Sequence, residues 1–152
     1  MAYDVVTFGE VMLRLSPPDF QRFEQTDSYD AHAGGAEMNV AVACSRLGLD
    51  SAYVTKLGDN SIGHFIRNKA REHGVDTSNV LWDPENRCGV YFVEFGAAPR
   101  TNRVIYDRKH SAISKIQTGE VNWDEVFDGT KLFHTSGITP ALSESCADVT
   151  SP

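Results

Sequence analysis

Two adjacent glycines, Gly34 and Gly35, stand directly before a run with helical periodicity, and this junction constrains the fold more than any other stretch. Paired glycines permit a positive φ and let a ligand come close to the backbone. The first turn of a helix presents unpaired N–H groups and a positive dipole end, which favours an oxygen-rich ligand, and Asn39 can add donors and an acceptor for a polyol. The alternative is a tight turn with an ordinary helix cap. The predicted helix ends at Gly48. Its apolar residues at helical spacing are Ala36, Val40, Ala43, Cys44 and Leu47.

Short apolar runs alternate with helical patterns around this junction. Residues 3–8 and 52–57 indicate buried strands of a parallel sheet, and residues 62–70 form a helical stripe that ends at Gly74. A series of strand, helix, strand and helix with short turns predicts a doubly wound α/β fold. Later in the chain the sequence predicts a short helix over 123–127 capped by Asn122, a third core strand over 132–135 and a helix capped by Ser143.

Two stretches depart from this pattern. Residues 10–33 begin as an alternating strand and continue as a polar segment with isolated aromatic residues. Residues 87–95 and 101–108 both have a period of two and are joined by a turn containing glycine and proline, which predicts an antiparallel hairpin. We expect these segments to leave the main sheet as a flap or small subdomain.

The second strand of the predicted hairpin carries a candidate binding pair. Tyr106 and Arg108 project from the same face because side chains alternate along a strand. A guanidinium beside a phenol suits a carboxylate or keto-acid oxygen, since arginine can bind a carboxylate with two parallel hydrogen bonds. The alternative is a solvated flap in which Arg108 pairs with Asp107 or Glu94.

Composition excludes several classes of function. The net charge of −7 and the absence of a run of Lys or Arg exclude a nucleic-acid footprint. The apolar runs are too short for a membrane span, and the N-terminus has no signal core. Three widely spaced cysteines and five histidines without ligand spacing predict no metal site, and they favour the reducing cytoplasm over a disulfide framework.

Known catalytic and nucleotide motifs are missing from the sequence. There is no Gly-x-Ser-x-Gly elbow, no phosphate-binding loop of the Gly-x-x-x-x-Gly-Lys type and no Gly-x-Gly-x-x-Gly fingerprint. Three core strands make a thin sheet with one unpaired edge, so we expect residues 1–152 to be the N-terminal part of a longer domain.

Five segments, in order, resemble the ribokinase-like (PfkB) carbohydrate kinases, and within that family the 2-keto-3-deoxygluconate kinase subgroup. The resemblance covers the chain to about Ser145. The segments run from Val5 to Leu15, Gly34 to Ala41, Gly89 to Phe92, Val104 to Arg108, and Ser136 to Leu142.

The resemblance implies a three-layer α/β/α sheet, incomplete in this chain, with a small β lid made from about residues 10–33 and 87–110. It implies that Arg108 meets the carboxylate of a sugar acid, and that Arg14 stands where ribose- and adenosine-type members carry an Asp. It also implies a homo-oligomer formed through the lid. The implied substrate-binding residues are Gly35, Ala36, Glu37, Met38, Asn39, Tyr91, Tyr106, Asp107 and Arg108.

The reaction that the resemblance implies is transfer of the ATP γ-phosphoryl group, with Mg²⁺, to a terminal hydroxyl of 2-keto-3-deoxygluconate. The family's catalytic Gly-Ala-Gly-Asp motif does not occur in these residues, so we expect no catalytic residue, no ATP pocket and no turnover in this chain alone. Two alternatives remain open: a kinase of fructose or another ketose, and a non-catalytic sugar-binding or dimerising module.

Overall fold

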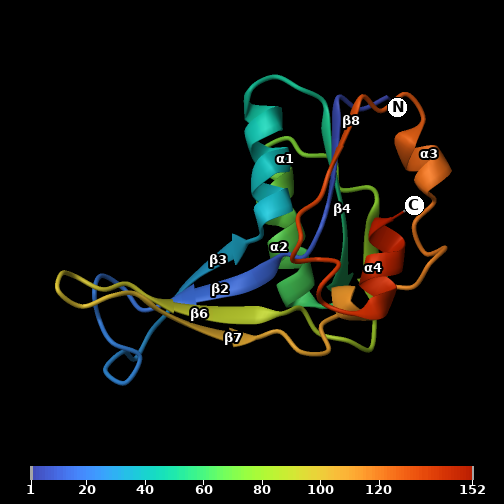
Figure 1. Ribbon diagram of the computed structural model, residues 1–152. Coiled ribbons are helices and arrows are strands. Elements are labelled where there is room, and N and C mark those ends of the chain that lie inside the picture. The colour runs from blue at the N-terminus through green and yellow to red at the C-terminus, as the bar shows by residue number, and fades with distance from the viewer. Residues whose placement is uncertain (1, 152) are drawn as a thin grey trace.

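The computed structural model describes residues 2–151, which form two sheets with helices beside the first (Figure 1). The main sheet has four parallel strands in the order β5-β4-β1-β8. These strands are β1 (Val5–Phe8), β4 (Ser51–Gly58), β5 (Val80–Asp83) and β8 (Leu132–His134). The prediction of three core strands was wrong, because it missed β5, an edge strand whose two middle residues are only half-buried.

Helices cover both faces of the main sheet. Tyr53 and Leu57 of β4 pack on one face against α1 (Ala36–Arg46) and α2 (Ser61–Arg71). Val6 and Phe8 of β1 point to the opposite face, because side chains alternate along a strand. There they pack against the 3₁₀ helix η1 (Ile113–Lys115), α3 (Trp123–Phe127) and α4 (Glu144–Thr150). The three-layer α/β/α arrangement is therefore confirmed.

Capping side chains mark the starts of three helices, and a glycine marks the end of α1. The Asn60 side chain accepts hydrogen bonds from the N–H groups of Ile62 and Gly63 at the start of α2. Asn122 and Ser143 cap α3 and α4 in the same way, as predicted. Gly48 ends α1 and has a φ of +89°, a conformation that glycine adopts without strain.

The second sheet has the strand order β3-β2-β6-β7 and extends away from the main sheet (Figure 1). We call this sheet the lid. The sequence prediction of an antiparallel hairpin is confirmed by the pairing of β6 with β7, whereas β2 pairs with β6 in parallel. Its strands are β2 (Met12–Ser16), β3 (Asp30–Gly34), β6 (Val90–Glu94) and β7 (Arg103–Asp107).

Strand β8 lies at one edge of the main sheet, beside β1 alone. Its first residue, Leu132, is 57% exposed, and the nearby Ile138 is also exposed. An uncovered edge with apolar side chains is a template for pairing with another strand.

The exposed β8 edge predicts self-association. Leu132→Lys should shift the protein toward the monomer in sedimentation velocity runs at increasing concentration, because a charged side chain on an edge strand opposes strand addition. Leu47→Lys is the matched control, since Leu47 is 83% exposed but lies at the end of α1, away from the edge. A wild-type protein that stays monomeric at every concentration would contradict this prediction.

Candidate functional site

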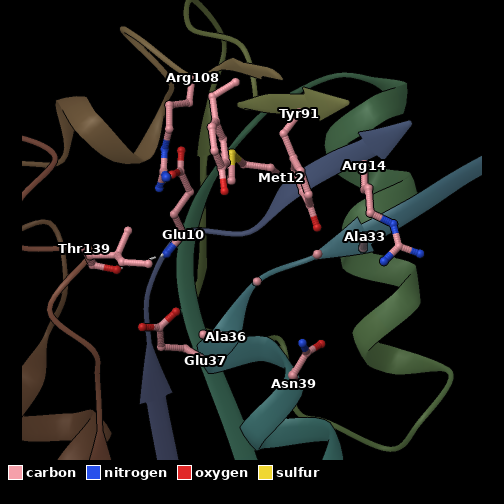
Figure 2. Close-up of a pocket in the computed structure, with 14 residues that line it drawn as sticks. Glu10, Met12, Arg14, Ala33, Ala36, Glu37, Asn39, Tyr91, Arg108 and Thr139 are labelled. Carbon is pink, nitrogen blue, oxygen red and sulfur yellow. Dashed lines mark hydrogen bonds and ion pairs between the residues drawn. The ribbon is translucent and has the colours of Figure 1, made fainter. Parts of the chain in front are cut away.

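A cavity of about 360 Å³ lies where the lid meets the carboxyl end of β1 and the start of α1 (Figure 2). Ligands of α/β proteins bind outside the carboxyl ends of the strands, so this is the expected place for a site. The lining residues are Glu10, Met12, Arg14, Ala33, Gly34, Gly35, Ala36, Glu37, Asn39, Tyr91, Tyr106, Arg108, Ile138 and Thr139.

Of the nine residues predicted to bind substrate, seven line this cavity and two do not. Met38 points into the core between α1 and the main sheet. Asp107 lies on the opposite face of β7 from Tyr106, and its carboxylate accepts a hydrogen bond from Arg87 at 2.5 Å. The structure therefore places Met38 and Asp107 outside the cavity.

The two glycines matter for close packing and not for a positive φ. Gly35 caps α1 with a φ of −167°, which is ordinary extended backbone, so the expectation of a positive φ was wrong. A Cβ on Gly35 would lie 2.6 Å from the carbonyl oxygen of Glu10, and a Cβ on Gly34 would collide with the Tyr91 hydroxyl. The absence of side chains at these positions lets the turn pack against the start of the lid.

The first turn of α1 brings a carboxylate to the cavity wall. Glu37 is buried, and its Oε1 atom accepts a hydrogen bond of 3.0 Å from the backbone N–H of Ser136. Its carboxyl group packs against Gly9, at the end of β1. Glu37 thus joins α1 to the segment that follows β8, while Asn39 lines the cavity one turn from the start of the helix.

Two tyrosines from the lid form an aromatic wall. Tyr91 of β6 and Tyr106 of β7 are cross-strand partners whose rings stack with centroids 5.8 Å apart. The guanidinium of Arg108 lies 5.7 Å from the Tyr106 ring centroid. Flat rings with hydroxyl groups suit a sugar, because they offer both an apolar face and hydrogen bonds.

Arg108 forms an ion pair with Glu10, a residue that the sequence reasoning did not single out. Neither partner expected for Arg108 in the solvated alternative binds it, since Asp107 pairs with Arg87 and Glu94 with Arg100. The signal that could have identified Glu10 is its position directly after a buried strand, at the carboxyl end of the sheet.

The surroundings of Glu10 are polar but almost closed to water. Its carboxylate also accepts a hydrogen bond of 2.9 Å from the Ser111 hydroxyl, and its backbone N–H donates to Thr139 Oγ1. Burial raises the pKa of the Glu10 carboxyl above its ordinary 4.5, although the positive charge of Arg108 and the hydrogen bond from Ser111 act in the opposite direction.

The described residues show two further properties that bear on function. Within residues 2–151, no group of three or more His, Cys, Asp or Glu side chains is placed to hold a metal ion. No helix in the same range is long and apolar enough to cross a membrane.

The fold is an α/β sheet with a β lid, and a cavity with polar and charged lining residues lies between the two. Residues 2–150 match the family described as pfkB family carbohydrate kinase, and the chain belongs to that family.

The similar proteins are sugar kinases. The 2-dehydro-3-deoxygalactonokinase of Haloferax volcanii is 46% identical over 150 residues, which cover 99% of this chain and 46% of that protein. The crystal structure of 2-dehydro-3-deoxygluconokinase from Thermotoga maritima is 47% identical with a TM-score of 0.94, over 97% of this chain and 45% of that one. The chain therefore spans about half the length of the relatives it matches.

A more distant structure shares the fold. A putative ribokinase II from E. coli, solved in complex with ATP and Mg²⁺, has a TM-score of 0.86 at 21% identity, over 99% of this chain and 47% of that one. The ribokinase-like fold is thus kept at low sequence identity.

Removing Arg108 should destabilise the protein. Arg108→Leu leaves the carboxylate of Glu10 buried without its cation, and we expect the free energy of unfolding to fall by about 3 kcal/mol in urea denaturation. Arg103→Leu is the control, because Arg103 pairs with Glu24 at an exposed site where an ion pair contributes about 1 kcal/mol or less. Equal losses in the two variants would show that the Glu10–Arg108 pair behaves as a surface pair.

Glu10 should also give stability a recognisable dependence on pH. Since the pKa of Glu10 is raised above 4.5 on folding, the folded protein holds this proton more tightly than the unfolded chain. The stabilisation from Glu10 is fully present below pH 4.5 and is lost as the pH rises through the folded pKa. Wild type should therefore lose free energy of unfolding, relative to Glu10→Gln, as urea denaturation is repeated from about pH 4 to about pH 7. A constant difference between the two proteins would refute the raised pKa.

Proposed function

We propose that this chain forms the sugar-binding part of a kinase that phosphorylates a 2-keto-3-deoxy sugar acid on its terminal hydroxyl, with ATP as the phosphoryl donor. Two enzymes that share nearly half of its residues are named as kinases of such acids. The observation that carries the proposal is the cavity itself, where two guanidinium groups and two stacked tyrosines stand over a glycine turn at the end of β1.

The lining side chains suit the parts of a sugar acid. Asn39, Tyr91 and Tyr106 offer hydrogen bonds to hydroxyl and keto oxygens, and the tyrosine rings offer apolar surface to the carbon chain. Arg14 and Arg108 offer guanidinium N–H donors to a carboxylate, and of the two only Arg108 is already paired with a carboxylate among residues 2–151. The glycine turn lets the Tyr91 hydroxyl and the Glu10 backbone come close, which sets the wall of the cavity. A lid over the bound sugar would exclude water, which favours transfer to the sugar over hydrolysis of ATP.

The alternative substrate is fructose or another neutral ketose. It would use the same hydrogen bonds but leave Arg14, which forms no ion pair among residues 2–151, without a charged partner. The sugar acid is therefore the better match to the lining residues.

We propose that ATP and Mg²⁺ are bound by residues outside this sequence. The described residues do not fit the metal, because no acidic cluster suited to a divalent cation is found among residues 2–151. The sequence also lacks the Gly-Ala-Gly-Asp segment that the family resemblance implies for catalysis. In this proposal the chain binds and orients the sugar acid and does not transfer phosphate alone, which makes it a sugar-binding module when isolated. Its cytoplasmic location stays a prediction.

A second copy of the chain is the proposed partner, with the lid as the contact. Val104 and Ile105 on the edge strand β7 are both about half exposed. Apolar side chains on an edge strand favour pairing with another strand.

Binding without turnover is the expected behaviour of the purified chain. Isothermal titration should give tighter binding of 2-keto-3-deoxygluconate than of ribose, and no ADP should form when ATP and Mg²⁺ are added. Asn39→Ala should weaken binding about fivefold through loss of a hydrogen bond, whereas Asn68→Ala, on the exposed part of α2, should have no effect.

The two parts of this proposal fail separately. Ribose binding as tight as that of the keto acid would remove the sugar-acid assignment. ADP formation by the purified chain that depends on the sugar would show that it is a complete kinase.

A further inference from the structure

A second pocket, of about 400 Å³, lies between the segment that follows β7 and the residues that precede α4. It adjoins the cavity under the lid, because Arg108 lines both. We call it the basic pocket, since four of its described lining residues are basic and none is Asp or Glu. The lining residues are Arg108, Lys109, His110, Ser114, Lys115, Ala141, Leu142 and Ser143.

The two lysines of the basic pocket have no counter-charge among residues 2–151. The sequence contains five lysines. Three of them, Lys56, Lys69 and Lys131, form ion pairs with carboxylates. Lys109 and Lys115 form none in that range, and both line the same pocket. In a protein with a net charge of −7, the lysines without a counter-charge are therefore concentrated at one place.

The carboxylates near the basic pocket do not neutralise these lysines. Glu10 pairs with Arg108, so that arginine supplies N–H donors to the pocket but little net charge. Asp107 pairs with Arg87. Glu144, the first residue of α4, is exposed and forms no ion pair among the residues that the structure describes. The positive potential of the pocket comes from Lys109 and Lys115.

A hydrogen-bonded turn holds one wall of the pocket in place. The N–H group of Ser111 donates to the carbonyl oxygen of Arg108 at 3.3 Å, and Arg87 donates to the carbonyl oxygen of Lys109 at 3.3 Å. His110 lies in this turn with a φ of +57°, which is uncommon for a residue other than glycine. Binding to a backbone that is already fixed costs less conformational entropy than binding to a free loop.

The donor groups of the pocket suit phosphate oxygens. A lysine ammonium binds phosphate as a point charge, and an imidazole has at least one N–H donor in either protonation state. Lys109, His110 and Lys115 are exposed, so a dissolved anion can reach them. Separate donors around a pocket match a group with several oxygens better than a flat carboxylate, which is best bound by the fork of one guanidinium.

From these observations we infer that Lys109, His110 and Lys115 form an anion site that binds phosphate groups, separate from the cavity under the lid. None of the three residues lines that cavity, so the inference does not depend on the proposed function. The same chemistry could come from inorganic phosphate or from the phosphate chain of a larger molecule, and the test distinguishes these two sources.

The test titrates the purified chain with inorganic phosphate and with tripolyphosphate at constant ionic strength. The variant Lys109→Gln/Lys115→Gln should bind the tighter of the two anions at least about tenfold more weakly, because each lost charge-assisted hydrogen bond contributes about 1.5 kcal/mol or more. The matched control is Lys69→Gln/Lys131→Gln, which removes the same amount of charge from exposed sites elsewhere and should change binding less than about twofold. Melting temperatures confirm that each variant is folded.

The position of the site is tested on the wild-type protein. In ¹⁵N-labelled protein, either anion should shift the backbone amide resonances of residues 109–115 and leave those of Gly34 and Gly35, in the cavity under the lid, unchanged. Shifts confined to the two glycines would overturn the inference.

The remaining outcomes separate the sources or refute the site. Inorganic phosphate that binds as tightly as tripolyphosphate identifies a site for one phosphate group, and much tighter binding of tripolyphosphate identifies a site for a phosphate chain. Both results support the inference. No binding of either anion would overturn it, and so would an equal loss in the two double variants. The proposed sugar-acid kinase would be unaffected, since its own test uses the sugar acid.

Discussion

The ion pair between Glu10 and Arg108 holds together parts of the chain that lie far apart in sequence. Glu10 follows the central strand β1, and Arg108 follows the outermost lid strand β7, 98 residues later. The pair therefore fixes the outermost strand of the lid to the middle of the main sheet. Because Glu10 also accepts from Ser111 and its backbone N–H donates to Thr139, the end of β1 is joined to two segments, residues 108–111 and the loop that follows β8. The shape of the cavity depends on this buried contact.

The main sheet and its helices could be predicted from the sequence because they follow from local patterns. The hydrophobic pattern of β1, of β4 and of α2 is enough to predict that each of them is buried. Asn60 and Ser143 mark the starts of helices, because their side chains accept hydrogen bonds from N–H groups two or three residues later. Strand β5 was missed because it is an edge strand with two half-buried residues, whereas all four residues of β1 are buried. The parallel pairing of β2 with β6 was also not predicted, since it joins residues about 75 positions apart.

Sequence reasoning identified only those site residues whose type and position on a strand or turn already suggest a role. Tyr91, Tyr106 and Arg108 could be placed on the lid by alternation and by the family resemblance. Glu10 was missed because its importance comes from a partner that only the tertiary structure brings near. The glycines were correctly singled out for the wrong reason, since their role is the close approach of Tyr91 and of the Glu10 backbone. A pattern can show that a side chain must be small without showing what it must make room for.

The two arginines of the cavity show why residue type alone does not assign a role. Arg14 lies on β2 and Arg108 directly follows β7, and both line the same cavity. Sequence reasoning favoured Arg108 because a phenol stands beside it. What distinguishes them is the counter-charge: the buried carboxylate of Glu10 pairs with Arg108, whereas Arg14 forms no ion pair among residues 2–151. The buried Nε–H group of each arginine has no acceptor in the described part of the protein. The binding free energy of an anion is most favourable where the protein's positive charge has no other counter-charge and where the anion accepts from every buried donor.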